Sequence, residues 1–144
     1  MRVAQILKTK DTRIITIRLR ETVAAAAKMM VNENIGALVV TDVVATEGST
    51  VVGVISERDL MRALVNSNGQ DILKLPVEKL MTKKLISCTP EDHLADVMEK
   101  MDRYAIRHLP VMDDHTLVGV LSVRDVIRVL RGVVPVESET VAAA

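Results

Sequence analysis

The chain has 144 residues, 19 basic and 19 acidic side chains, and a hydrophobic content of 49% that includes one Tyr and no Phe or Trp. Zero net charge argues against broad binding to a nucleic-acid backbone or an anionic membrane, and the lack of aromatic rings excludes base stacking as the main means of holding single-stranded nucleic acid. Cys88 is the only cysteine, which excludes an internal disulfide and a cysteine-based zinc cluster.

The amino-terminal segment is too short and too charged in its apolar part for a signal peptide, and no apolar run approaches the roughly 18 residues of a membrane helix. We therefore expect a soluble cytoplasmic protein. Its core must be aliphatic and rich in methionine, because the chain has 8 Met and almost no aromatic residues.

The first half of the chain opens with a predicted short helix, a strand and a longer helix. Residues 3–7 have a helical pattern, and the β-branched run at 13–17 is typical of a strand. Thr22 can cap the next helix, whose apolar residues recur at helical spacing. Asn34 and Gly36 tolerate the left-handed conformation and indicate its end.

A hairpin and a second helix follow. Residues 37–41 are typical of a buried strand, and residues 51–55 of its antiparallel partner. Ser56 begins a helix with an apolar face formed by Leu60, Met61, Leu64 and Val65. Core packing is the simplest explanation of this face, and the alternative is that part of it pairs two protomers.

The second half repeats the first. Residues 15–42 align with residues 86–113, and the heptapeptide GVISERD at 53–59 returns as GVLSVRD at 119–125. The alignment predicts a strand at 86–88, a helix with Leu94, Val97, Met98 and Met101 on one face, a hairpin of 108–112 with 117–121, and a last helix lined by Val126, Ile127 and Leu130.

The duplication predicts an α+β fold made of two pseudo-symmetric β-α-β-β-α repeats, because a unit of this length packs as a half-domain rather than as one turn of a solenoid. Turn residues at 66–69 separate the repeats, which gives limits of 1–68 and 69–132. Residues 133–144 lose the periodic pattern, and we expect a disordered tail there.

The heptapeptide places a Ser and an Asp at the start of a helix in each copy. The simpler interpretation is a capping box, in which Ser56 caps the helix and Asp59 takes the place of the usual Glu. A cap, however, requires neither the preceding Gly53 nor the intervening Arg58.

The same geometry also suits a nucleotide. Free backbone N–H groups at Ser56 and the positive end of the helix dipole would hold a phosphate, with Arg58 as a further donor. Asp59 is an acceptor that suits a sugar diol, and Gly53 would let a ligand approach the backbone closely. The counterparts in the second copy are Ser122, Arg124, Asp125 and Gly119.

The order strand, helix, strand, strand, helix, present twice and closed each time by Gly-hydrophobic-hydrophobic-Ser-x-x-Asp, resembles a pair of cystathionine-β-synthase (CBS) domains, the Bateman module. The resemblance covers nearly the whole chain. It implies a regulatory module that binds adenosine-containing ligands between the repeats and acts as an energy or redox-state sensor. It also implies a disc-like homodimer formed through the helices. Either a protein partner regulated in trans or a role as a free sensor has to be assumed.

Residue roles follow from the same resemblance. Asp59 and Asp125 would hold ribose hydroxyls, and Ser56, Arg58, Ser122 and Arg124 would lie near phosphate. Strand residues would enclose the adenine, and we expect contacts from Thr16, Ile17, Gly36, Ala37, Ser87, Cys88 and Ile106. The motif leaves open which ligand binds: AMP, ADP, ATP, NAD(H) and S-adenosylmethionine all occur in the family.

The two clefts are not expected to be chemically equal. The second copy has Arg107 and His108 at its strand start, which is similar to basic positions that meet phosphates in the family, whereas the first copy has Gly36 and Ala37 there. One site should therefore bind better, and Arg107 could serve either. For His108 two interpretations stand side by side, a partly buried hydrogen-bonding residue and a ligand group.

Catalysis fits the sequence poorly. Cys88 aligns with the apolar Ile17, which favours a small buried hydrophobe over a nucleophile, and the three histidines lack the spacing of metal ligands. We expect neither an enzyme nor a catalytic cofactor nor a metal site. The alternative to a nucleotide sensor is a structural dimerisation module that keeps the fold and binds no nucleotide.

Overall fold

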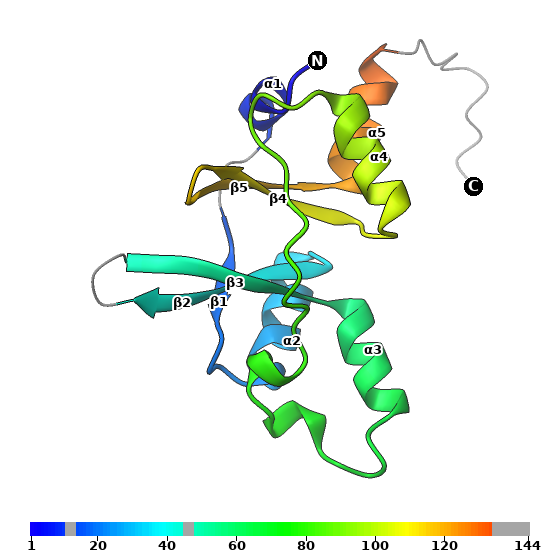
Figure 1. Cartoon of the computed structure of the whole chain (residues 1–144). Helices are drawn as coiled ribbons and strands as arrows, with labels where there is room; N and C mark the ends of the chain where they lie inside the picture. Colours follow the sequence, from blue (N-terminus) through cyan, green and yellow to red (C-terminus); the bar gives the residue numbers. More distant parts are fainter. Residues whose placement is uncertain (11–13, 45–47, 134–144) are drawn as a thin grey trace, which may run out of the picture.

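The computed structural model describes residues 1–10, 14–44 and 48–133. Their helices and strands, in chain order, are α1 (Val3–Lys8), β1 (Thr16–Arg18), α2 (Val23–Glu33), β2 (Ala37–Val44), β3 (Gly48–Ser56), α3 (Glu57–Val65), the 3-10 helices η1 (Ile72–Lys74) and η2 (Val77–Lys79), α4 (Leu94–Arg103), β4 (His108–Asp113), β5 (Thr116–Ser122) and α5 (Val123–Val133) (Figure 1).

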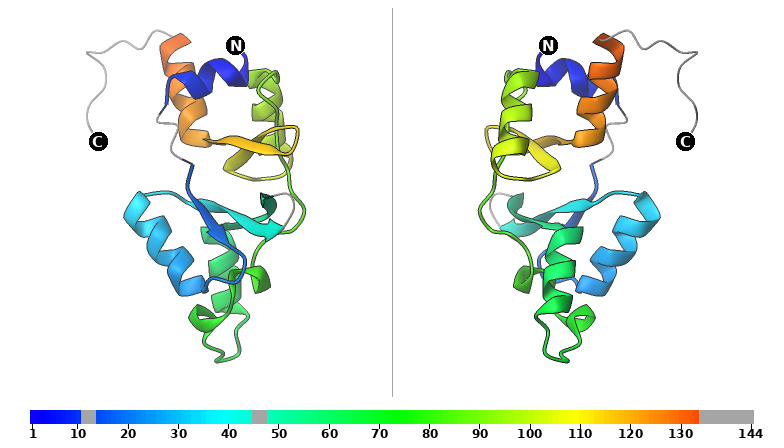
Figure 2. Two further views of the ribbon diagram at one scale, coloured as in Figure 1. Left: turned by 90° about the vertical axis from the view of Figure 1, so that its left-hand side faces the viewer. Right: turned by 90° about the vertical axis from the view of Figure 1, so that its right-hand side faces the viewer.

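Two small sheets lie next to each other at the centre of the molecule. The first has the order β1-β2-β3, with β1 parallel to β2 and β2 antiparallel to β3, and the second is the antiparallel hairpin β4-β5. Helices α2 and α3 lie on the outer side of the first sheet, and α4 and α5 on the outer side of the second (Figures 1 and 2). The predicted α+β class is confirmed, and the order of elements is duplicated except for the first strand of the second repeat.

Each sheet has its own aliphatic core, and each core also contains a short segment from the other half of the chain. Helix α1, at the start of the first half, packs in the core of the second sheet, and η2, at the start of the second half, packs in the core of the first. Val3 and Ile6 of α1 are buried with the side chains of β4 and β5, whereas Val77 of η2 is buried with those of β1, β2 and β3. The backbone N–H of Val3 donates to Asp92, and that of Val77 donates to Glu21. Neither half of the sequence therefore contains a complete core, and the limits at residues 68 and 69 stay a prediction.

The predicted strand at 86–88 is reduced to one parallel bridge between Cys88 and Val111. Two prolines explain the loss. The N–H of Leu19 donates to Thr41 in the first repeat, but Pro90 aligns with Leu19 and has no N–H. Pro110 likewise replaces Val39, the partner of Thr16 in the β1 to β2 ladder, and cannot donate to an extended neighbour.

Most local signals in the sequence are confirmed. The Thr22 hydroxyl caps α2 by accepting the N–H of Ala25 at 3.1 Å, and Asn34 ends that helix with a left-handed φ of 54°. Gly36 does not take this conformation; a Cβ there would lie 3.0 Å from His108 Cε1, so a larger residue would require the imidazole to shift by a few tenths of an ångström. Both hairpins form, and β2 and β3 are longer than predicted.

One expectation concerns residues outside the described ranges. The disordered tail is expected at 133–144, of which 134–144 are not described, whereas Val133 is the last residue of α5. Within the described ranges, none of the helices has the length and apolar character needed to span a bilayer.

Candidate functional site

Both heptapeptides form complete capping boxes at the strand-to-helix turn. In the first repeat, the Ser56 N–H donates to Asp59 Oδ2 at 2.9 Å and the Asp59 N–H donates to Ser56 Oγ at 3.4 Å. In the second, the Ser122 N–H donates to Asp125 Oδ2 at 2.8 Å and the Asp125 N–H donates to Ser122 Oγ at 3.2 Å. The capping interpretation is confirmed in both copies.

The helix starts offer fewer free donors than an open phosphate site would. The N–H of Glu57 donates to the carbonyl oxygen of Gly36 at 3.0 Å, and the N–H of Val123 donates to that of Arg107 at 2.9 Å. These bonds join each helix to the residue that precedes the first strand of its hairpin. The N–H groups of Ser56 and Ser122 donate to the motif acids, so the expectation of free N–H groups at these two residues is wrong, and a phosphate would depend more on side chains.

Gly53 and Gly119 have a different role from the one expected. A Cβ on Gly53 would lie 2.6 Å from the carbonyl oxygen of Thr82, and a Cβ on Gly119 would lie 2.7 Å from Leu7 Cδ2. In each case the space is filled by the segment that leads into the other repeat. The glycines thus admit protein, and the idea that they admit a ligand is not supported.

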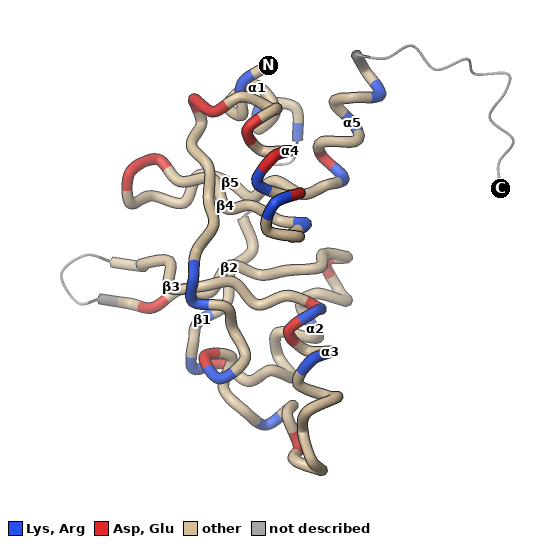
Figure 3. The backbone as a smooth tube through the Cα atoms, turned by 45° about the vertical axis from the view of Figure 1, so that its right-hand side comes forward, with Lys and Arg blue, Asp and Glu red and all other residues tan. Residues whose placement is uncertain are grey.

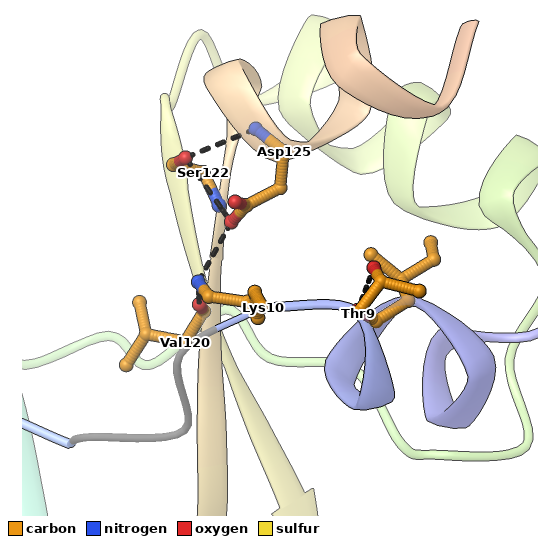
Figure 4. A network of polar contacts seen from close by, with 6 residues as sticks. Thr9, Lys10, Val120, Ser122 and Asp125 are labelled. Atoms are coloured by element: carbon orange, nitrogen blue, oxygen red, sulfur yellow. Dashed lines mark hydrogen bonds and ion pairs between the residues drawn. The ribbon is translucent and has the colours of Figure 1, made fainter. Parts of the chain in front are cut away.

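The segment that leads into the first repeat reaches Asp125, the motif acid of the second repeat. Lys10 Nζ donates to Asp125 Oδ2 at 2.8 Å and to the carbonyl oxygen of Val120 at 2.6 Å (Figure 4). The second leading segment makes the matching contact in the first repeat, where the Thr82 hydroxyl donates to Asp59 Oδ1 at 3.3 Å. We call these groups the Asp125 site (Lys10, Ser122, Asp125) and the Asp59 site (Ser56, Asp59, Thr82).

Lys10 and Thr82 were missed by sequence reasoning. A signal existed, because each is a polar residue shortly after the apolar leading helix of its repeat. The alignment nevertheless set Lys8 opposite Thr82, and the longer loop of the first repeat begins at this point. The sequence alone could not show which polar residue would reach Asp125.

The Asp125 carboxylate is 6% exposed and charged. Burial raises its pKa, but the hydrogen bonds from Lys10 and Ser122 and the charge of Lys10 outweigh burial and hold the pKa below its ordinary value. Oδ2 accepts these bonds, while Oδ1 has no donor among the described residues.

A cavity of about 450 Å³ adjoins this carboxylate, and its lining includes Ile6, Thr9, Lys10, Asp125, Arg128 and Val129. It lies between the leading segment and α5. Its volume is within the range of small-molecule sites, and an apolar wall with a few convergent charges is typical of them. The Asp125 site therefore combines a buried anion, a cation and room for a ligand.

His108 lies where the two repeats meet. A Cβ on Gly36 would be 3.0 Å from Cε1 of His108 and 3.2 Å from Oε1 of Glu57. The imidazole and the Glu57 carboxylate therefore both lie next to Gly36. Burial lowers the pKa of His108; Glu57 and Asp125 oppose this, while Arg107 and Lys10 add to it. The ring is half-buried and neutral at pH 7, and it forms no side-chain hydrogen bond among the described residues, so both interpretations of His108 stay predictions.

The three predicted arginines are placed differently. Arg58 Nη1 donates to the carbonyl oxygen of Ala105 at 2.7 Å, a residue with a left-handed φ of 52° just after α4. Arg58 thereby links the first repeat to the second. Arg107 and Arg124 are exposed, and their side chains form no hydrogen bond or ion pair with another described residue, so both are accessible from solvent.

The predicted strand residues divide into core and half-buried positions. Ile17 and Cys88 are buried in the two cores, so their side chains are enclosed by protein and only their backbone can face a ligand. Ala37 is also buried, and half-buried positions are Thr16, Gly36, Ser87 and Ile106. Burial, aided by Asp92 and opposed by Lys100, raises the pKa of Cys88 to about 11, which fits a small unreactive hydrophobe.

A second cavity, of about 330 Å³, lies at the end of β1 and is lined by Arg18, Leu19, Arg20, Glu21, Asp42 and Val43. None of the predicted site residues lines it. Basic and acidic positions are interspersed along both repeats (Figure 3). The described chain contains no cluster of three or more His, Cys, Asp or Glu placed to hold a metal ion.

Known proteins share both the sequence pattern and the fold. The sequence model of the CBS domain matches residues 3–66 and 77–132. A 17.7 kDa protein of Acidianus ambivalens is 36% identical over 130 residues, which cover 90% of this chain and 73% of that protein.

Two solved structures show the same arrangement. A signal-transduction protein with CBS domains from Burkholderia ambifaria has a TM-score of 0.82 at 30% identity, with all of both chains covered. The CBS domain pair of protein MJ0100, solved with 5'-methylthioadenosine and S-adenosyl-L-methionine, has a TM-score of 0.78 at 27% identity and covers 93% of this chain and 98% of that one. The duplicated motif, the paired sheets and these matches together establish that the chain belongs to the CBS domain family, as a tandem pair of CBS domains.

Proposed function

We propose that this CBS pair is a regulatory module, not an enzyme, that binds adenosine-containing ligands at the Asp125 and Asp59 sites. Ligand occupancy would alter the contact between the repeats and so report the level of an adenine compound. Such a module shifts an equilibrium by its different affinities for the ligand in two states.

One observation carries this proposal. Each motif acid lies at the N-terminus of a helix and faces the leading segment of the other repeat, at 2.8 Å for Lys10 and 3.3 Å for Thr82. A ligand bound to either acid would therefore touch both repeats at once. That is the geometry a sensor needs, because binding then bears on how the repeats sit together.

The Asp125 site offers a definite pose. A ribose hydroxyl can donate to Oδ1, which has no donor among the described residues, and the adenosine can occupy the adjoining cavity of about 450 Å³. The exposed side chains of Arg107 and Arg124, with His108 near the contact between repeats, would serve a phosphate. MJ0100 holds two adenosine compounds in the same fold, which supports the ligand class.

A homodimer is the second part of the proposal. Met61, Leu64 and Val65 on α3 are 60%, 56% and 81% exposed, and Ile127 on α5 is 51% exposed. Apolar side chains gathered on the outer helices are costly in water and favour pairing with a second copy. This surface is also the specific observation that favours the alternative function, a dimerisation module without a nucleotide.

A thermal-shift panel tests the function. AMP, ADP, ATP, NAD, NADH and S-adenosylmethionine are added to the full chain, where a ligand at about 100 times its Kd should raise Tm by roughly 5–10 °C. Asp125→Asn should reduce the shift, whereas Asp113→Asn, an exposed acid on β4, should leave it unchanged. No shift with any ligand would favour the dimerisation module.

A further inference from the structure

The two motif acids are equivalent in sequence but face partners of different charge. Asp59 accepts a hydrogen bond from the neutral hydroxyl of Thr82 at 3.3 Å. Asp125 accepts one from the ammonium of Lys10 at 2.8 Å (Figure 4). Among the described residues Asp59 forms no ion pair. The Asp59 site therefore keeps a negative charge that the Asp125 site has already balanced.

Lys10 retains the capacity to bind a ligand while it holds Asp125. A lysine ammonium has three N–H donors, and among the described residues two of them are engaged, by Asp125 and by the carbonyl oxygen of Val120. Asp125 Oδ1 is likewise without a described donor. A ligand can thus contact both groups without breaking the ion pair.

The surroundings favour an anion at this point. Lys10 and Arg128 line the cavity with one carboxylate, that of Asp125, so the named charged side chains there give it a net positive charge. The ammonium is 24% exposed, and a charge this enclosed is only weakly screened by water and salt. A phosphate would accept a charge-assisted hydrogen bond from the third N–H, whereas an uncharged acceptor at the same place would gain a weaker one.

We propose that Lys10 makes the Asp125 site selective for adenosine ligands that carry a phosphate over uncharged adenosine ligands, and that the Asp59 site lacks this selectivity. This inference rests on the proposed function and names the ligand class at one of its two sites. Lys10 acts here as a specificity-determining residue, and the hydroxyl of Thr82 at the equivalent place does not discriminate by charge.

Adenosine and AMP are the matched probes, because they differ only by the phosphate. Binding is followed by methyl NMR on the full chain, which resolves the two sites. Ile6 lines the cavity and reports the Asp125 site, and Met81 contacts the position of Gly53 beside Thr82 and reports the Asp59 site. Each titration yields a Kd for AMP and for adenosine at each site.

The variants isolate the charge at residue 10. Lys10→Met and Lys10→Gln remove it at similar length, Lys10→Arg keeps it, and Lys8→Met removes an exposed lysine of the same segment that does not line the cavity. At the Asp125 site, as reported by Ile6, AMP should bind at least tenfold more tightly than adenosine, a difference in binding free energy of about 1.4 kcal/mol. This should hold for the wild type and for the Lys10→Arg and Lys8→Met variants. In Lys10→Met and Lys10→Gln the preference for AMP over adenosine at the Asp125 site should fall to about threefold or less. The two Kd values at the Asp59 site, as reported by Met81, should not change.

Other outcomes overturn the inference. If both neutral variants keep the tenfold preference, or lose AMP and adenosine binding by the same factor, Lys10 does not select for phosphate. Tighter AMP binding in Lys10→Met would show that Lys10 blocks the site. If neither probe shifts any methyl signal in the wild type, the proposed function itself fails, which distinguishes that result from the loss of selectivity alone.

Discussion

Gly53 and Thr82 are in such close backbone contact that a Cβ on the glycine would lie 2.6 Å from the carbonyl oxygen of the threonine. Thr82 also exchanges two backbone hydrogen bonds with Val54, at 3.1 and 2.8 Å. These contacts hold the leading segment of the second repeat against β3, and the Thr82 hydroxyl thereby reaches Asp59. The lack of a side chain at Gly53 thus allows the segment that leads into the second repeat to pack against β3.

Gly53→Ala should destabilise the fold by about 1–3 kcal/mol or more, because a backbone oxygen cannot move aside as a flexible side chain can. Urea denaturation followed by circular dichroism measures the change. Gly132→Ala is the control: it lies in α5 with no neighbour within 4 Å of a Cβ, and should be neutral or stabilising by about 0.5–1 kcal/mol. Equal stability of the Gly53 variant and the wild type would contradict the proposed close contact.

Cys88 should resist thiol reagents in the folded protein. It is 2% exposed and burial raises its pKa to about 11, so at pH 8 almost none of it is both accessible and ionised. Reaction with a chromogenic disulfide reagent should proceed at least a hundredfold more slowly in buffer than in guanidinium. Comparable rates in the two conditions would mean that the thiol is not enclosed by the core of the second repeat.

His108 should make the apo protein less stable in mild acid. Its pKa is lowered by burial in the folded state, so the unfolded chain binds a proton first as the pH falls below about 6.5. The stability that neutral His108 contributes is therefore fully present above its pKa in the unfolded chain. It is lost as the pH falls from that value to the lower pKa of His108 in the folded state.

Chemical denaturation at intervals between pH 8 and pH 5 measures this dependence. Replacing His108 by Gln should flatten the decline, and His93→Gln, an exposed histidine at the start of α4, should not. An unchanged slope in the His108 variant would remove His108 as its source.

The apolar outer face should govern self-association. A Met61→Glu, Leu64→Glu double variant introduces two charges into exposed positions of α3 and should convert a dimer into a monomer, as measured by light scattering after size exclusion. Leu73→Glu, in η1 and 47% exposed, is the control that should leave the dimer intact. A wild type that is monomeric at high concentration would refute the homodimer.

Much of the fold could be predicted because its signals are local or repeated. The Thr22 cap, the left-handed Asn34 and the two capping boxes depend on residues a few positions apart. The repeated heptapeptide then gave the order of elements and the pairing of the two halves.

The errors have non-local causes. The strand at 86–88 was overestimated because Pro90 and Pro110 act through hydrogen bonds that only become visible once the partner strands are known. Gly53 was assigned to a ligand because a sequence shows the lack of a side chain without showing what fills the space. Lys10 was missed because the loop that carries it differs in length from its counterpart.

Isothermal titration of the full chain with AMP tests the central claim most directly, when the wild type is compared with Asp59→Asn, Asp125→Asn and the double variant. Asn keeps an oxygen that can accept the capping bond from Ser56 or Ser122 but loses the charge, so the fold should persist. We expect binding by the wild type, a weakened or lost site in each single variant and no binding by the double variant. Binding of AMP to the double variant with wild-type affinity would contradict the account.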